Sequence, residues 1–378
     1  MTTPLRILLA DDSVTVRRLL TETLASDSEL EVCHAARDGQ EALLQFPLVQ
    51  PDVVVLDVEM SVMDGIETIV AIRKLNARVP IIMFGSLTTR GGEATLDALS
   101  NGATDYSTKP THVGHLQDAV DQIRKDLIPM IKHWSQWYRD QRQAPSASPA
   151  ADHIEHNRPV TPGCESLLAA PGPTVRSDQP VEIIAIGVST GGPSALESVL
   201  KLIPKQFPVP IVIAQHMPPL FTGLLAERLN QICPLPVHEA LDGARLAPGQ
   251  VWIAPGNQHL IVEKNGFYLR VRLDHGPLVN SCRPSVDVLF RSIAETIGGA
   301  SIAVVLTGMG HDGLEGCRLI RSKGGKVIAQ DQATSVVWGM PRAVVEAGLA
   351  DQVLPLHSIA GELIRLSQVG PSAMSCVC

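Results

Sequence analysis

Short apolar runs alternate with amphipathic helical patterns through the first part of the chain. Five of these runs have the length of buried strands, and they lie near residues 5–10, 30–34, 52–57, 79–84 and 103–107. After each run, apolar residues recur every three or four positions, which indicates a helix. Five strand–helix units in succession predict an α/β domain of the doubly wound, flavodoxin-like type, with a five-stranded parallel sheet.

Regular periodicity stops between about Arg139 and Pro180. This segment contains seven prolines among clustered Ala and Ser, a composition typical of a flexible linker. The aromatic stretch 133–138, just before it, is interpreted as packing locally rather than as a docking patch. We therefore predict a first domain over residues 1–130, a helix end and flexible linker over 131–180, and a second domain over 181–370.

The second domain alternates less regularly. Parallel strands are expected near residues 181–188, 209–215, 301–306 and 326–330. Between about 236 and 273 the chain has several shorter strand-like runs, and the residues that separate them, Gly249, Gly256 and Asn265-Gly266, are typical of hairpin turns. The pattern predicts a mainly parallel sheet with helices on both faces and an antiparallel hairpin region.

Composition narrows the function. The 378 residues carry a net charge of −8, which argues against a general nucleic-acid binder because such proteins need an excess of positive charge. No apolar run approaches the ~20 residues of a membrane helix, and the first residues lack the features of a signal peptide. We therefore expect a cytoplasmic protein without membrane insertion. The seven cysteines lack paired C-x-x-C spacing, so free thiols are expected.

Acidic side chains follow the strands of the first domain. Asp11 and Asp12 end the first strand, Asp57 ends the third, and Lys109 follows the fifth. These side chains should converge, because ligands of open parallel sheets bind outside the carboxyl ends of the strands. Three carboxylates in one crevice suit Mg²⁺, and a lysine opposite them suits a further anion such as an aspartyl phosphate.

A serine with flanking glycines follows the first strand of the second domain. The stretch Gly187-Val188-Ser189-Thr190-Gly191 has the G-x-S-x-G spacing that exposes a nucleophilic hydroxyl between a strand and a helix. Two other interpretations remain open at this point. In the first, Ser189 only caps the helix. In the second, the glycines bind a phosphate at the N-terminus of the helix.

Partners for a nucleophilic serine appear at neighbouring strand ends. His216 ends the next strand, and Asp312 follows a later one, so a base and an orienting acid reach the same sheet edge as Ser189. The order Ser, His, Asp differs from that of α/β-hydrolases, trypsin-like proteases and subtilisins. His311 and Asp331 rank next, ahead of other polar candidates, which are His238, His259, His275, Asp242 and Asp287.

A glycine pattern near the third partner suggests a different function. Residues 308–313, G-M-G-H-D-G, match the G-x-G-x-x-G of dinucleotide-binding sites. The motif follows a late strand instead of opening the usual βαβ unit, and a dinucleotide site leaves Ser189 and His216 without a role. A dinucleotide-binding enzyme is therefore the less favoured interpretation.

Residues 5–125 resemble the receiver domain of two-component response regulators. The resemblance implies that Asp57 is the phospho-acceptor and that Mg²⁺ binds beside it. The metal ligands would be Asp11, Asp12, Asp57 and the backbone carbonyl of Glu59. Lys109 would be the conserved lysine and Tyr106 the switch aromatic. Two positions depart from the pattern. Gly85 stands where a phosphoryl-sensing hydroxyl is usual, with Ser86 one place later, and Ser61 replaces a common proline.

Residues 181–369 are similar to the catalytic domain of chemotaxis protein-glutamate methylesterases. The matching stretches are I-G-V-S-T-G-G-P-S-A-L, Q-H-M-P-P-L-F-T, L-T-G-M-G-H-D-G and Q-D-Q-A-T-S-V-V-W-G-M-P. The resemblance maps a catalytic triad onto Ser189, His216 and Asp312. Thr190 and the backbone of Met309 match positions that support the active site and the oxyanion.

The resemblance implies a regulated hydrolase. Its substrates would be glutamate γ-methyl esters on the cytoplasmic helices of chemoreceptors, and glutamine deamidation would be a second activity. Its phosphodonor would be a chemotaxis histidine kinase. No metal or other cofactor is expected at the catalytic site. We hypothesise that the unphosphorylated receiver covers the Ser189 edge. The alternative is a non-catalytic chemosensory adaptor.

Overall fold

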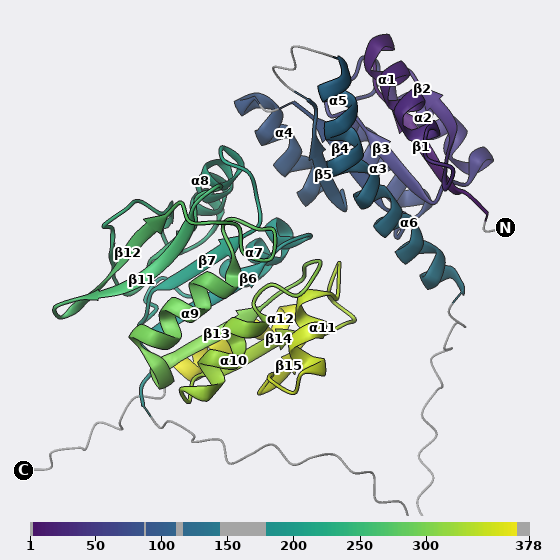
Figure 1. The fold of residues 1–378 in the computed structure, drawn as a ribbon. Coiled ribbons are helices and arrows are strands. Elements are labelled where there is room, and N and C mark those ends of the chain that lie inside the picture. The colour runs from purple at the N-terminus through teal and green to yellow at the C-terminus, as the bar shows by residue number, and fades with distance from the viewer. Residues whose placement is uncertain (1–2, 87, 111–115, 144–178, 369–378) are drawn as a thin grey trace, which may run out of the picture.

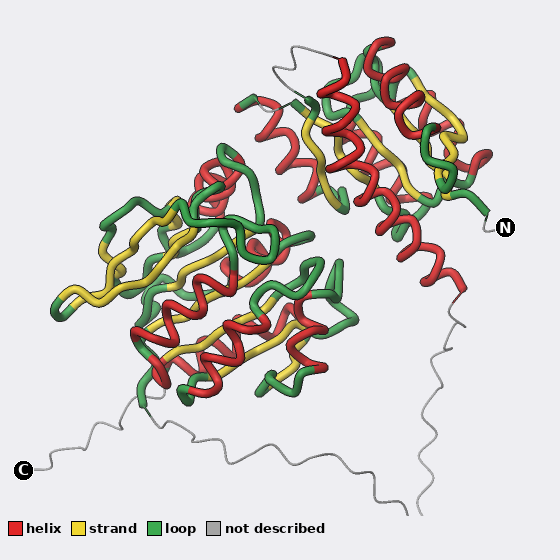
Figure 2. Tube along the Cα trace, viewed as in Figure 1, coloured by secondary structure: helices red, strands yellow, loops and turns green. Residues whose placement is uncertain are grey.

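The computed structural model describes residues 3–86, 88–110, 116–143 and 179–368. They form two α/β units (Figure 1). In each unit, helices cover the faces of a central sheet (Figure 2). No helix among these residues is long and apolar enough to cross a membrane.

The first unit contains a parallel sheet in the strand order β2-β1-β3-β4-β5, which confirms the predicted fold. Its strands are β1 (Leu5–Ala10), β2 (Leu30–Ala36), β3 (Val53–Leu56), β4 (Ile81–Gly85) and β5 (Asp105–Thr108). All four residues of β3 are buried, because helices cover both faces of a parallel sheet. The helices are α1 (Val14–Ala25), α2 (Gly39–Val49), α3 (Gly65–Leu75), α4 (Thr89–Ser100), α5 (Leu116–Gln122), the π-helical turn η1 (Ile123–Leu127) and α6 (Ile128–Gln143).

Helix α6 extends beyond the predicted end of the first domain. Trp134 and Tyr138 are buried, and Tyr138 accepts a hydrogen bond of 2.7 Å from Asn76. Arg139, where the linker was predicted to begin, is helical, and its Nε lies 3.0 Å from the Asp52 carboxylate. The aromatic side chains therefore hold α6 against the sheet. Most of the predicted linker, from residue 144 to 178, lies outside the described residues.

The second unit contains a seven-stranded parallel sheet in the order β15-β14-β13-β6-β7-β10-β8. Its strands are β6 (Ile183–Val188), β7 (Ile211–Gln215), β8 (Val237–Glu239), β10 (Val251–Ile253), β13 (Ser301–Val305), β14 (Lys326–Gln330) and β15 (Gln352–Leu354). The short strands of the hairpin region thus divide between two sheets. Two of them, β8 and β10, extend the main sheet, whereas β9 (Arg245–Leu246), β11 (His259–Asn265) and β12 (Tyr268–Asp274) form an antiparallel sheet.

The predicted hairpin turns differ in kind. Asn265 pairs with Tyr268 across a tight turn in which Gly266 has a φ of 61°, so this position is a hairpin. Gly249 has a φ of 72° and precedes β10. Gly256 does not serve a hairpin. A Cβ there would lie 2.2 Å from the backbone nitrogen of Pro219, so glycine permits close packing beneath the loop after β7.

Among the described residues, six helices flank the main sheet in two layers. Helices α7 (Gly192–Leu200), α8 (Phe221–Ile232) and α12 (Leu356–Ser367) bury Leu196, Leu225 and Leu363 on one face. Helices α9 (Val286–Thr296), α10 (Leu314–Ser322) and α11 (Met340–Glu346) bury Phe290, Ile320 and Val344 on the other. Alternate side chains of β6 point into the two cores, as strand geometry requires.

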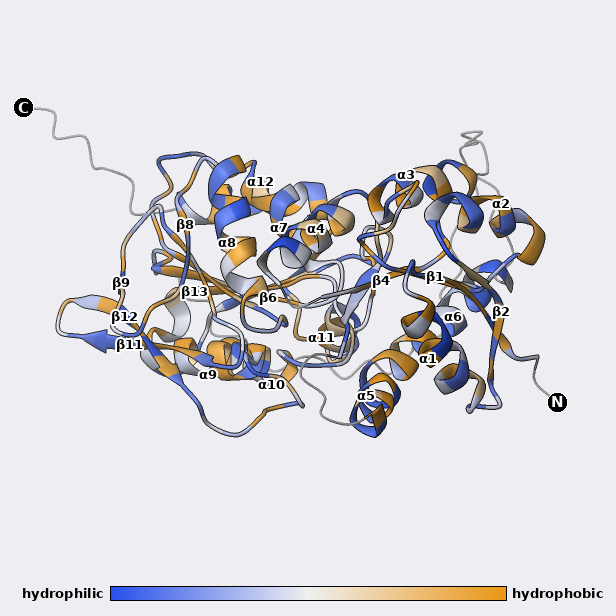
Figure 3. Cartoon of the chain, turned by 90° about the horizontal axis from the view of Figure 1, so that it is seen from above, coloured by the Kyte–Doolittle hydropathy of each residue, from blue (hydrophilic) through white to orange (hydrophobic). Residues whose placement is uncertain are grey.

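The two units meet along α4 of the first unit and α7 and α8 of the second (Figure 3). Tyr106 stacks on Phe221 with ring centroids 5.0 Å apart. Arg228 of α8 forms an ion pair with Asp97 of α4. The contact is close, because a Cβ on Gly92 would lie 2.6 Å from Cδ1 of Leu224.

Candidate active site

Ser189 lies in a sharp turn between β6 and α7. The chain turns at Gly191, whose φ of 76° favours glycine. The other glycines allow close packing. A Cβ on Gly187 would lie 2.2 Å from Val286, and one on Gly192 would lie 1.9 Å from Gln215. The turn leaves Ser189 only partly buried, so its hydroxyl is accessible.

Strand pairing places His216 beside Ser189. Val188 and Gln215 are partners in the β6–β7 ladder, and each precedes one of these residues. The His216 backbone N–H donates to the Val188 carbonyl at 3.2 Å. Within the described part of the chain, the Ser189 hydroxyl makes no hydrogen bond to His216. The two side chains nevertheless line the same cavity.

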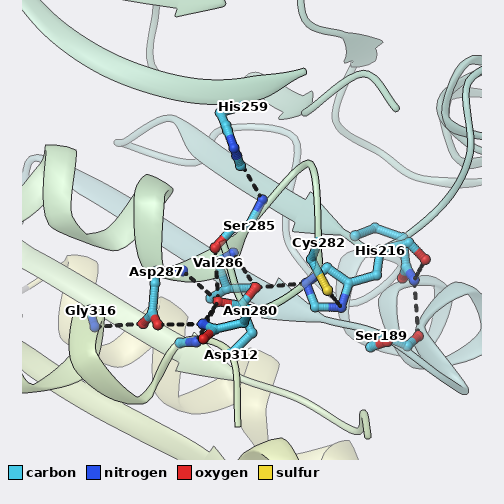
Figure 4. Close-up of polar contacts among 12 residues, drawn as sticks. Ser189, His216, His259, Asn280, Cys282, Ser285, Val286, Asp287, Asp312 and Gly316 are labelled. Carbon is cyan, nitrogen blue, oxygen red and sulfur yellow. Dashed lines mark hydrogen bonds and ion pairs between the residues drawn. The ribbon is translucent and has the colours of Figure 1, made fainter. Parts of the chain in front are cut away.

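Asp312 binds the far nitrogen of the imidazole. Its Oδ2 lies 2.8 Å from Nε2 of His216 (Figure 4). It is also surrounded by hydrogen-bond donors, which are the side chains of Asn280 and Ser285 and the backbone N–H groups of Val286, Asp287 and Gly313. Since Nε2 is engaged, Nδ1 is the nitrogen left to accept a proton from a nucleophile.

The pair carries opposite charges at neutral pH. Burial alone would raise the pKa of Asp312, but its hydrogen bond and Coulombic attraction to His216 outweigh burial and lower the pKa to about 2. Burial would lower the pKa of His216. Its contacts with Asp312 and Cys282 outweigh that effect and raise the pKa to about 9. The imidazole must therefore lose a proton before it acts as a base.

The loop after β13 forms the other side of the Ser189 turn. Ser189 donates its backbone N–H to the Thr307 carbonyl at 3.0 Å, and Thr307 Oγ1 donates to the Thr190 carbonyl at 2.9 Å. A Cβ on Gly308 would lie 2.8 Å from Cβ of Ser189, so glycine permits this approach. Among the described residues, the backbone N–H groups of Thr190 and Met309 have no acceptor, which leaves them available to an oxyanion.

The first unit forms one wall of the cavity that contains Ser189. This cavity of about 580 Å³ is lined on the second unit by Ser189, Thr190, His216, Cys282 and Met309, and on the first by Tyr106, Ser107, Thr108, Asp126 and Met130. The walls therefore belong to both units.

Some candidate residues lie apart from this arrangement. His311 is exposed, and the Asp331 carboxylate accepts hydrogen bonds from Thr334, which closes a local turn. Asn280, Cys282 and Ser285, which contact the His–Asp pair, were not anticipated. They lie in a tight turn and at the N-cap of α9, where no periodic pattern indicates which side chains point inward.

The acidic side chains of the first unit also converge. Oxygen atoms of Asp11, Asp12 and Asp57 lie within 4.8 Å of one another. Lys109 Nζ lies 2.6 Å from Asp57 and 2.8 Å from Asp11. Burial raises the pKa of Asp57 to about 6, although Lys109 opposes the shift. A divalent cation beside these oxygens would relieve that cost, so the residues fit an oxygen-ligated Mg²⁺.

Ser86, Gly85 and Glu59 of the first unit make contacts of three different kinds. Ser86 Oγ lies 3.3 Å from Thr88 Oγ1. Gly85 is buried, and a Cβ there would lie 3.2 Å from Thr95 Oγ1. The Glu59 side chain pairs with Arg90 at 3.4 Å.

Comparisons with known proteins agree with both units. The family model "CheB methylesterase" matches residues 184–363, and "Response regulator receiver domain" matches residues 7–121. The chain is 48% identical to a protein-glutamate methylesterase/protein-glutamine glutaminase of Trichodesmium erythraeum, over 95% of this chain and 98% of that protein. It is 46% identical to one from Nocardioides sp., over 97% of each.

Solved structures match each unit separately. The CheB methylesterase catalytic domain of Thermotoga maritima is 46% identical, covers 49% of this chain and 98% of its own, and has a TM-score of 0.49. The response regulator domain of Thermotoga maritima CheB is 32% identical, covers 35% of this chain and 97% of its own, and has a TM-score of 0.31.

Proposed function

The chain belongs to the CheB family of protein-glutamate methylesterases/protein-glutamine glutaminases, and we propose that it hydrolyses glutamate γ-methyl esters of chemoreceptors under the control of its receiver domain. The observation that carries the proposal is that Ser189 and His216 line one cavity, one wall of which belongs to the receiver, while Asp312 binds His216 at 2.8 Å. We assign the receiver to residues 1–130, the helix end and linker to 131–180, and the catalytic domain to 181–370.

The proposed reaction begins with proton transfer to His216. Ser189 Oγ attacks the ester carbonyl carbon while Nδ1 of neutral His216 takes its proton, because Asp312 holds Nε2. The backbone N–H groups of Thr190 and Met309 stabilise the oxyanion. Imidazolium then protonates the methoxide, methanol leaves, and a water activated by His216 hydrolyses the acyl-serine to glutamate.

The same steps accommodate a glutamine side chain. With an amide in place of the ester, the imidazolium proton goes to the leaving nitrogen and ammonia is released. The acyl-serine is identical, so a single site serves both activities. Amide nitrogen is the poorer leaving group, and deamidation therefore depends more strongly on the proton that His216 donates.

Regulation is proposed to follow from the receiver's position. A chemotaxis histidine kinase phosphorylates Asp57 in the cytoplasm. Asp11, Asp12, Asp57 and the Glu59 carbonyl would hold Mg²⁺, whose positive charge would offset the negative charge of the phosphoryl group. Lys109 forms an ion pair with Asp57 in the unphosphorylated protein, and after phosphorylation it pairs with the phosphoryl oxygens. Tyr106 and Ser86 would report that change, and Tyr106 reaches the catalytic domain through Phe221.

Methanol release separates this function from a non-catalytic adaptor. Receptor-bearing membranes are methylated with radioactive methyl groups, and volatile radioactivity is followed for the wild type and for Ser189→Ala. We expect Ser189→Ala to release none, while Asp57→Asn keeps only the basal rate with or without phosphodonor. Binding of the membranes without methanol release by the wild type would favour the adaptor.

A further inference from the structure

A tight turn contacts both ends of the His216–Asp312 pair. The turn spans residues 279–282, where the Val279 and Cys282 backbones exchange hydrogen bonds of 3.1 and 2.9 Å. Asn280 and Ser281 at its corners have φ values of 51° and 62°. Two successive positive φ values are typical of a type I′ turn, whose geometry is narrowly defined. The turn therefore fixes where its side chains point.

Its two inward side chains engage different partners (Figure 4). Asn280 Nδ2 donates to Asp312 at 2.8 Å and to Asp287 at 2.7 Å. Cys282 Sγ lies 3.6 Å from Nδ1 of His216. The proposed mechanism requires that same nitrogen to accept the Ser189 proton, and the contact is made by sulfur instead of by the serine hydroxyl.

We propose that Cys282 is a positioning residue of the hydrolytic site, whose sulfur holds Nδ1 of His216 until the Ser189 hydroxyl takes its place. This inference rests on the proposed Ser189–His216–Asp312 reaction. In the resting site, imidazolium Nδ1–H donates to the sulfur and Nε2–H donates to Asp312. The ring is thereby fixed at both nitrogens, and Ser189 has no acceptor.

The other charged groups near the ring do not supply this contact. Asp312 binds the opposite nitrogen. Asp287 lies behind Asp312 and is held by Asn280 and the Gly316 N–H. Across the cavity the receiver contributes Asp126 and Asp105, and the latter is engaged by Trp134 and Thr190. Among the residues that the structure describes, Cys282 is the group in contact with Nδ1.

The proposal predicts how the base titrates without the sulfur. Contacts with Cys282 act with Asp312 to raise the pKa of His216. Removing the thiol, as in Cys282→Ala, should therefore lower the pKa of His216. The neutral imidazole should then appear at lower pH. Sulfur is a weak acceptor, so we expect the acid limb of kcat to shift down by about half a pH unit to one unit.

The test uses the full-length protein with Mg²⁺ and a small phosphodonor, and compares the wild type with Cys282→Ala and Cys282→Ser. We measure kcat and KM for methanol release from pH 6 to 10, and His216 ionisation from ¹⁵N-histidine spectra. Both readouts should shift downward in Cys282→Ala with KM unchanged. Cys282→Ser should restore most of the wild-type profile, because its hydroxyl can still accept from Nδ1–H.

Cys233→Ala is the matched control. This thiol is partly buried at the end of α8 and does not contact the triad, so its variant should titrate like the wild type. An acid limb and a His216 titration that stay unmoved in Cys282→Ala would overturn the proposal. A failure of the proposed function would give a different result. Activity that persists in Ser189→Ala but disappears in Cys282→Ala would make the thiol, instead of Ser189, the nucleophile.

Discussion

The carboxylate of Asp105 in the receiver accepts a hydrogen bond of 3.2 Å from the hydroxyl of Thr190, the residue next to Ser189. The same oxygen accepts from Trp134 Nε1 at 3.2 Å, and the other oxygen accepts from the Tyr106 N–H. No basic side chain among the described residues pairs with it. The contact joins the receiver directly to the Ser189 turn, but it leaves a negative charge enclosed without a counter-ion.

Receiver docking should strengthen as the pH falls. Burial raises the pKa of Asp105 to about 6 in the docked form, whereas the exposed carboxyl of a separated receiver returns towards its ordinary value. A carboxyl with a raised pKa favours the docked form at low pH, and this contribution is lost as the pH rises through about 6. Small-angle scattering of the unphosphorylated protein should show more compact molecules at pH 5.5 than at pH 7.5.

The Asp105→Asn variant isolates this effect. An amide does not titrate in this range, so the pH dependence of the scattering curve should flatten between those two values. Scattering is preferred to activity because the protonation of His216 also changes the rate. A pH dependence as steep in Asp105→Asn as in the wild type would show that another group controls docking.

A larger side chain at Gly92 should separate the two domains. Its Cβ would lie 2.6 Å from Leu224 of α8, and overpacking typically costs about 1–3 kcal/mol. We expect Gly92→Leu to raise methanol release without phosphodonor by roughly 5- to 100-fold, on the basis that 1.4 kcal/mol changes an equilibrium tenfold. Gly361→Ala is the control, because nothing lies within 4 Å of a Cβ there. Equal basal rates in Gly92→Leu and wild type would contradict the prediction.

The ion pair between Arg228 and Asp97 should contribute modestly to docking. Arg228 also donates to Ser100 Oγ at 3.0 Å, and both charged side chains are partly exposed. Exposed pairs contribute about 0–1 kcal/mol, so Arg228→Asp should raise the basal rate by a few fold at low salt. The exchange Arg228→Asp with Asp97→Arg should lower the rate again. Failure of the double variant to recover would indicate that the pair has no direct role.

Asp312→Asn should nearly abolish hydrolysis while the fold is retained. The amide can hold the wrong tautomer of His216, and the equivalent change in serine proteases lowers kcat on the order of 10⁴-fold. Loss of the carboxylate should also lower the pKa of His216 from about 9. Asp242→Asn is a matched control, since Asp242 caps a backbone N–H in the hairpin region. A kcat within tenfold of wild type would exclude Asp312 as the orienting acid.

The alternation of apolar runs and amphipathic patterns was sufficient to predict both parallel sheets, and with them the edge where Ser189, His216 and Asp312 meet. The physical reason is that parallel strands present their carboxyl ends at a common edge, so residues that follow them become neighbours whatever their separation along the chain. The glycine spacing around Ser189 also predicted the sharp turn between strand and helix, because that turn depends on local backbone geometry.

Tertiary structure alone decided which side chains complete the site. Cys282 and Asn280 reach the His–Asp pair from a tight turn, and no periodicity indicates the direction of a side chain there. The contacts of Asp105 with Thr190 and of Tyr106 with Phe221 depend on how the two domains dock. Docking is set by the shape and charge of whole surfaces, which local sequence patterns do not encode.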